Sequence, residues 1–113
     1  MASKKKAPPV DVDAFFSRTV PRLLGAMRAL CAERGGRYGV VVDGRAFTID
    51  FAQAAVVAGA DNVDVTVTLS AAQFQSLAAG TELRKLVASG EAALSGDRDR
   101  IEDLSLVLAF LAR

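Results

Sequence analysis

An alternating segment centred on Asp43-Gly44 constrains the fold of this chain more than any other feature. Asp-Gly is a favoured pair for the two-residue turn that joins antiparallel strands, because both central positions need a positive φ. Such a turn places Val40 opposite Phe47, and most of the pairs that it brings together are apolar. The turn and the hydrophobic pattern therefore predict the same register. One face of the hairpin should be apolar along its length: Tyr38, Val40, Phe47, Ile49 and Phe51.

Three further segments have the pattern of strands. Ala54–Ala58 is a short apolar run, bounded by turn-forming residues. From Val63 to Ser70 apolar and polar residues alternate without a break, which is typical of a half-buried antiparallel strand. A brief strand follows at Glu91–Ser95, with Ala92 and Leu94 on one side. The sequence therefore predicts five strands.

An amphipathic helical segment precedes the hairpin. Asp11 or Asp13 can cap its beginning, and Gly35-Gly36 ends it. Its apolar residues recur at spacings that keep them on one face: Phe16, Val20, Leu23, Met27, Leu30 and Cys31. Pro21 lies within this pattern and has no backbone N–H to donate. We therefore expect a break, with Pro21 in the first turn of a second helix that runs to about Glu33.

Further helices are expected after the alternating strand. Ser70 and Gln73 have the spacing of a capping box, so a helix should begin where that strand ends. Thr81 is expected to cap a second, short helix, and Asp97 to cap the last helix of the chain. Strands and helices in this order indicate an α+β domain, with no internal repeat and no dividing linker.

The last helix has more apolar surface than one core-facing stripe requires. Its core stripe is expected to be Ile101, Leu104, Leu108 and Leu111. Most of the residues on its other sides are apolar in the final two turns: Leu106, Val107, Ala109 and Phe110. This second face should meet a bound ligand, a partner chain or the far wall of a cavity.

Length and charge limit the classes of function. The 113 residues allow one domain, expected over residues 11–113, after a disordered basic tail over residues 1–10. The net charge is +1, and without Lys4–Lys6 in that tail the acidic residues outnumber the basic ones. Nucleic acid is therefore excluded as a partner, and three lysines support at most a transient membrane contact. The single cysteine, Cys31, predicts a cytoplasmic protein without an internal disulfide.

The sequence lacks the residues that most enzymes use for acid–base or metal chemistry. It has no histidine, and one cysteine cannot form a thiolate zinc site. No glycine-rich phosphate loop is present. Four acidic residues lie close together without calcium-loop spacing, and we expect helix capping and a solvated face for them: Asp97, Asp99, Glu102 and Asp103. We predict no catalytic residue, no metal site and no cofactor.

From about Val12 the chain resembles the sterol carrier protein type 2 domain family, with the specific motifs in its second half. The resemblance rests on an acidic residue that opens a strand ending in Thr-Leu-Ser, a Phe/Leu helix, a Ser-Gly pair, a Gly-Asp pair and a leucine-rich last helix: Asp64–Ser70, Phe74, Leu77, Gly80, Leu86, Ser89-Gly90, Leu94, Gly96-Asp97, Leu104 and Leu108. The compact helix between Gly80 and Gly90 is similar to that of short bacterial variants. These variants favour a general bacterial lipid-binding role over sterol transfer.

The resemblance implies a curved, mostly antiparallel five-stranded sheet, covered on one side by helices, with an apolar tunnel between them. It also implies a lipid or fatty-acyl ligand, bound or transferred without catalysis. On this hypothesis the ligand-binding residues come from the hairpin and the later helices: Phe47, Ile49, Phe51, Phe74, Leu77, Leu104, Leu108 and Phe110. The alternative is an interaction module without an open tunnel, which forms a homodimer through Leu106, Val107 and Phe110.

Overall fold

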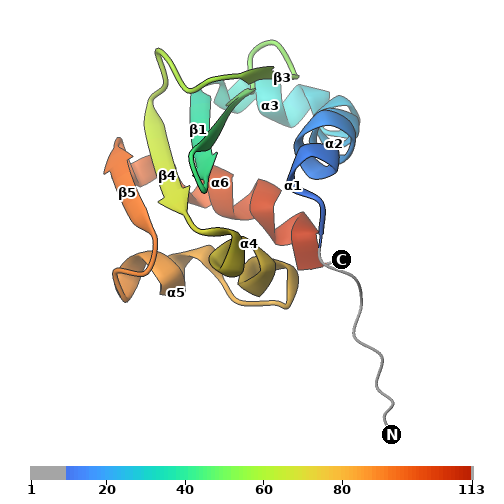
Figure 1. Cartoon of the computed structure of the whole chain (residues 1–113). Helices are drawn as coiled ribbons and strands as arrows, with labels where there is room; N and C mark the ends of the chain where they lie inside the picture. The colour runs from blue at the N-terminus through green and yellow to red at the C-terminus, as the bar shows by residue number, and fades with distance from the viewer. Residues whose placement is uncertain (1–9, 113) are drawn as a thin grey trace, which may run out of the picture.

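A computed structural model describes residues 10–112 of the chain (Figure 1). The basic tail predicted over residues 1–10 lies outside the described residues, apart from Val10. The backbone of Val10 is held by the Gln75 side-chain amide, which accepts from Val10 N–H at 2.9 Å and donates to Val10 C=O at 2.8 Å. The described chain therefore begins at a residue that is fixed to the domain.

Five strands form one mixed sheet in the order β3-β2-β1-β4-β5. Their bounds are β1 Arg37–Val42, β2 Arg45–Asp50, β3 Ala55–Ala58, β4 Val65–Leu69 and β5 Ala93–Gly96. Three of the four pairings are antiparallel, which confirms the predicted mostly antiparallel, five-stranded sheet. The β4 strand, however, runs parallel to β1. Its prediction as an antiparallel strand is wrong on this side, because the connection over residues 59–64 returns the chain to the beginning of β1.

The predicted hairpin is confirmed residue by residue. Val40 pairs with Phe47 and Tyr38 pairs with Ile49, as the Asp-Gly turn requires. Both turn residues have the positive φ of a primed turn, 48° at Asp43 and 84° at Gly44. The apolar face of the hairpin therefore points into the core, where Tyr38 and Ile49 are buried.

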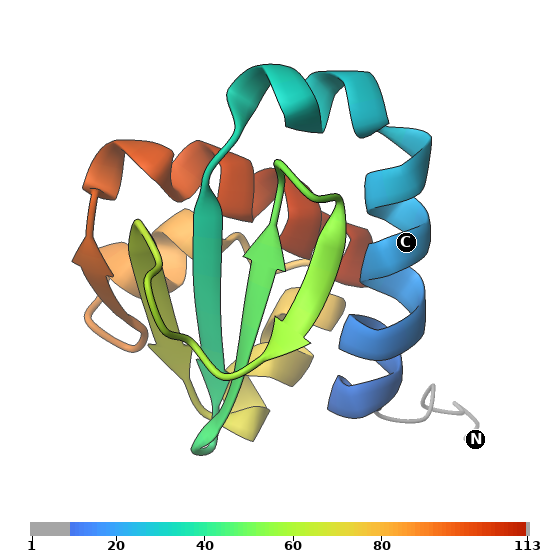
Figure 2. The same ribbon diagram turned by 90° about the horizontal axis from the view of Figure 1, so that it is seen from above.

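The N-terminal helices are α1 Val12–Ala14, the π-helical η1 Phe15–Thr19, α2 Val20–Ala26 and α3 Arg28–Arg34. This helical segment runs without a gap from α1 to α2 and changes direction before α3 (Figure 2). Asp11 caps α1, and Pro21 lies in the first turn of α2, as expected. The expected break before Pro21 is absent: the backbone widens into a π turn, which tolerates the missing N–H. The interruption lies instead at Met27, between α2 and α3.

The second half contains α4 Ala71–Ala78, α5 Leu83–Ala88, the 3-10 turn η2 Arg98–Arg100, α6 Ile101–Leu108 and the 3-10 turn η3 Ala109–Ala112. The capping box of Ser70 and Gln73 is present, and Asp97 caps η2 at the start of the last helical segment. The prediction for Thr81 is wrong. The cap of α5 is Glu82, without a side-chain hydrogen bond, because the helix begins one residue later than expected.

The helices α4, α5 and α6 cover one face of the sheet, and α1 and α2 lie beside its β3 edge (Figure 2). The core lies between these layers. The other face is partly covered by the connection over residues 59–64: Thr48 Oγ1 donates to Gly59 C=O at 2.6 Å, and Thr48 is only 1% exposed. Gly39 on the same face lies against Ala60 and Val63. Ligand access is therefore to be sought on the helical side.

Replacing Gly96 by alanine should destabilise the fold far more than replacing Gly90. Both glycines have a positive φ, 94° at Gly96 and 85° at Gly90. An alanine in this backbone conformation destabilises the folded state by about 1–2 kcal/mol. A Cβ at Gly96 would also lie 2.5 Å from Asp64 O, in the β4–β5 pairing, whereas nothing lies within 4 Å at Gly90. We expect a loss of roughly 3 kcal/mol or more for Gly96→Ala in urea unfolding. Equal losses for the two variants would contradict the close approach.

Candidate functional site

A cavity of about 260 Å³ lies between α4, α5 and the outer side of α6. Its residues come from the end of α4, the beginning of α5 and one side of α6: Leu77, Thr81, Glu82, Leu83, Arg84, Glu102, Ser105, Leu108 and Ala109. Leu77, Leu83 and Leu108 are 3%, 3% and 1% exposed and form its inner wall. Charged residues lie among the exposed lining residues. The cavity thus combines an apolar wall with a charged mouth.

The sequence of α6 explains why this space is not filled. Ser105 and Ala109 are four residues apart, so they lie one above the other on the side of the helix that faces the cavity. Both side chains are small, and a leucine at either position would extend into the space. Phe110 and Leu106, the larger neighbours, are not among the residues that line the cavity.

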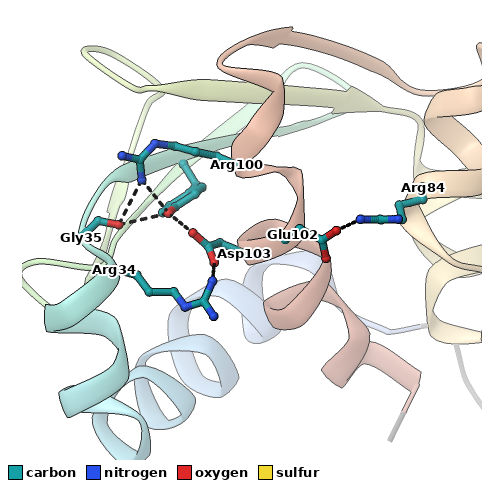
Figure 3. A network of polar contacts seen from close by, with 7 residues as sticks. Arg34, Gly35, Arg84, Arg100, Glu102 and Asp103 are labelled. Carbon is teal, nitrogen blue, oxygen red and sulfur yellow. Dashed lines mark hydrogen bonds and ion pairs between the residues drawn. The ribbon is translucent and has the colours of Figure 1, made fainter.

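Two polar features belong to the cavity. Ser105 Oγ is buried and has no hydrogen-bond partner within residues 10–112. Such orphan hydroxyls are uncommon, since most buried polar atoms are paired. At the mouth, Arg84 of α5 forms an ion pair with Glu102 of α6 (Figure 3). Their side chains are 55% and 60% exposed, so this pair spans the two helices at the protein surface.

A polar network fixes the opposite side of α6 (Figure 3). Tyr38 Oη donates to Asp103 Oδ2 at 2.6 Å, and Arg34 Nη1 donates to Asp103 Oδ1 at 2.6 Å. Arg100 Nη1 donates to Tyr38 Oη at 3.1 Å and lies 3.4 Å from Gly35 C=O. Asp103 is only 7% exposed, so the expectation that it belongs to a solvated face is wrong. The reason is that β1 and α3 supply partners for its carboxylate.

Burial and this network shift pKa values in this region. Burial, together with the hydrogen bond to Asp103, raises the pKa of Tyr38 to about 12. The hydrogen bond to Tyr38 raises the pKa of the Arg100 guanidinium. Burial also raises the pKa of the Cys31 thiol, with a further contribution from the negative charge of Asp103. Cys31 is thus a protonated residue of the core, 0% exposed.

Residues 20–109 match the SCP-2 sterol transfer family, and this segment includes every residue that lines the cavity. The chain belongs to the SCP-2 sterol transfer family. Among curated proteins, none matches this SCP-2 family member. The family predicted from the strand ending in Thr-Leu-Ser and from the Gly-Asp pair is therefore confirmed.

Solved structures show the same SCP-2 fold. Sterol carrier protein domain 2 of Helicoverpa armigera matches with a TM-score of 0.68 and 19% identity, over 98% of this chain and 95% of that one. Sterol carrier protein-2 of Aedes aegypti, in complex with the C16 fatty acid palmitate, matches with a TM-score of 0.68 and 16% identity, over 86% and 93%. The ubiquinone synthesis protein UbiJ-SCP2 matches with a TM-score of 0.61 and 19% identity, over 90% of this chain and 95% of that one.

The ligand-binding residues predicted for this SCP-2 domain fall into different environments. Leu77 and Leu108 line the cavity between the helices. Phe47 lines a separate pocket of about 170 Å³ at the β3 edge, beside Phe16. Phe110 is partly buried in η3. The remaining four are packed in the core, at most 2% exposed: Ile49, Phe51, Phe74 and Leu104.

The three residues predicted as an interface also differ. Val107 is 0% exposed, so its side chain packs inside the domain. Leu106 is 37% exposed and, with Val57, is one of two large apolar residues that are clearly exposed in the described part of the chain. The second apolar face of the last helix is thus divided between core and solvent.

Arg84, Glu102 and Ser105 belong to the cavity but were not predicted as site residues. Arg84 and Glu102 occupy exposed helical positions, where charged residues are expected in any soluble domain. The sequence offers one signal: small residues at 105 and 109 interrupt the apolar surface of the last helix.

No group of three or more His, Cys, Asp or Glu within residues 10–112 is placed to hold a metal ion. None of the helices in that range has both the length and the apolar character to cross a membrane.

The pKa of Tyr38 can be tested directly, because it is the only tyrosine in the chain. An ultraviolet absorbance titration should give a pKa of about 12, well above the ordinary value of 10. The folded protein then retains a proton that the unfolded chain loses, so stability should fall as the pH rises from 10 to 12. Tyr38→Phe should lack this fall in urea unfolding. A tyrosine that ionises near pH 10 in folded protein would contradict the network.

Proposed function

We propose that this domain binds the apolar chain of a lipid or fatty acid in the cavity between α4, α5 and α6, without catalysis. The observation that carries the proposal is an unfilled space walled by the buried leucines 77, 83 and 108 in a member of a sterol transfer family. The palmitate complex of the Aedes aegypti protein supports a fatty-acyl ligand for this fold.

Desolvation supplies the affinity in this proposal. Each methylene transferred from water to an apolar wall is worth about 0.8 kcal/mol, part of which is lost when the chain is ordered. The cavity volume of about 260 Å³ is slightly below the roughly 300 Å³ at which small-molecule sites usually begin. A cavity of this size therefore suits a short chain or the end of a longer one.

A longer chain requires α5 to move away from α6. The α5 helix has only six residues, and its ion pair with α6 is solvent-exposed, which makes it a weak restraint. Leu83 and Leu86 hold α5 on the core and would be the last contacts to open. Delivery of such a ligand needs only a transient membrane contact by a cytoplasmic carrier.

The alternative proposal is a homodimer through the last helix. It rests mainly on Leu106, because Val107 is fully buried and Phe110 is partly buried. Light scattering distinguishes it: a dimer in the wild type that becomes a monomer with Leu106→Asp supports the interface. A monomer in both cases removes it and leaves the binding proposal unchanged.

Filling the cavity should weaken binding without unfolding the domain. In Ala109→Phe a large side chain is placed at the cavity wall, whereas in Ala29→Phe the same change is made at an exposed position of α3 outside this cavity. We expect Ala109→Phe to weaken the binding of a fluorescent fatty acid by tenfold or more. Ala29→Phe should bind like the wild type, and both should keep the wild-type circular dichroism spectrum.

Chain length provides the second readout of the same experiment. Affinity should rise by roughly tenfold for every two methylenes until the cavity is full, and then level off. Wild-type protein that binds no fatty acid of any length, and that carries no lipid when purified, would contradict the proposed function. Unchanged binding in Ala109→Phe would place the ligand elsewhere.

A further inference from the structure

One basic side chain, that of Arg84, lies at the mouth of the cavity. Arg84 is the only basic residue among those that line it, and it forms an ion pair with Glu102 of the facing helix. Figure 3 shows the two side chains extended toward each other across the gap between α5 and α6. The Arg84 guanidinium is therefore already paired with a carboxylate at the point where a ligand would enter.

We propose that Arg84 binds the anionic head group of the ligand, and that Glu102 occupies the place of this head group when the cavity is empty. The inference rests on the proposed function, and it names the ligand class: a single-chain amphiphile with an oxyanion at one end. The apolar chain lies along Leu77 and Leu108, and the carboxylate or phosphate remains at the mouth.

The chemistry of arginine favours this exchange. Its planar guanidinium presents paired N–H donors that match the two oxygens of a carboxylate or phosphate. The ion pair with Glu102 is exposed, so breaking it costs little. Once displaced, the Glu102 carboxylate is solvated, because its side chain is 60% exposed. No buried charge is left unpaired by the exchange.

The neighbouring ion pair on α6 shows the contrast. Asp103, the next residue, pairs with Arg34 but is buried, and its second oxygen accepts from Tyr38. An anionic ligand that paired with Arg34 would leave the buried carboxylate of Asp103 with one partner fewer, which is energetically costly. Figure 3 shows Glu102 and Asp103 directed to opposite sides of α6. Arg34 and Asp103 also line an open pocket of about 350 Å³ beside α6, so the difference between the two pairs is burial: only the exposed Arg84–Glu102 pair can exchange at low cost.

The orphan hydroxyl of Ser105 fits the same arrangement. Ser105 lines the cavity and also the neighbouring pocket beside α6, and its buried Oγ lacks a partner among the described residues. It can donate to an oxygen of the head group that Arg84 holds. Glu82 also lines the cavity. A bound anion is therefore attracted by Arg84 and repelled by the carboxylates of Glu82 and Glu102.

Calorimetric titration with decanoate, decyl phosphate and decanol tests the assignment. These probes share one chain length, and only the first two carry an anion. We expect Arg84→Gln to weaken the tighter-binding anion by roughly three- to tenfold and to leave decanol within about twofold. Glu102→Gln should tighten the binding of the same anion, because it removes the internal competitor. The ratio of decanoate to decyl phosphate affinity identifies the preferred oxyanion.

Arg45→Gln is the matched control. Arg45 is 58% exposed and pairs with Asp13, and neither residue lines the cavity. It should change no affinity. If decanoate and decanol bind equally and Arg84→Gln alters neither, the role of Arg84 is overturned while the proposed function stands. If none of the three probes binds to wild-type protein, the proposed function fails instead.

Discussion

The buried carboxylate of Asp103 is the interaction on which the arrangement of the helices depends. Its partners are Tyr38 on the central strand and Arg34 in the last turn of α3, so one group fixes α6 to two other elements. A buried charge without partners would be strongly unfavourable, which selects one rotational position of the helix. In that position the adjacent Glu102 faces α5. The mouth of the cavity is thus a consequence of how Asp103 is buried.

The last helix then has three kinds of surface. Leu104 is buried in the core, Leu108, Ser105 and Ala109 line the cavity beside α5, and Leu106 is exposed to solvent. The surplus of apolar residues in this helix is largely used within the domain, since Val107 is completely buried. What remains unfilled is an inter-helix cavity, displaced from the sheet-facing core in which Ile49 is packed.

Local features of the fold could be predicted, and long-range ones could not. The register of the β1–β2 hairpin could be predicted because the adjacent residues Asp43 and Gly44 determine it. The first residue of α4 could be predicted in the same way from the capping box of Ser70 and Gln73. The direction of β4 depends on a crossover that no local pattern encodes. For the site, hydrophobicity identified Leu77 and Leu108 but could not separate them from core residues, because a cavity is defined by what its neighbours leave empty. Arg84 had no local signal at all.

The most direct test of this account locates the ligand. An isotope-filtered nuclear Overhauser spectrum of decanoate bound to protein with ¹³C-labelled leucine and isoleucine methyl groups would report the contacts of the chain. The account predicts contacts from the decanoate methyl group to Leu77, Leu83 and Leu108, which line the cavity. Contacts to Ile49, in the sheet-facing core, with none to these leucines, would contradict it.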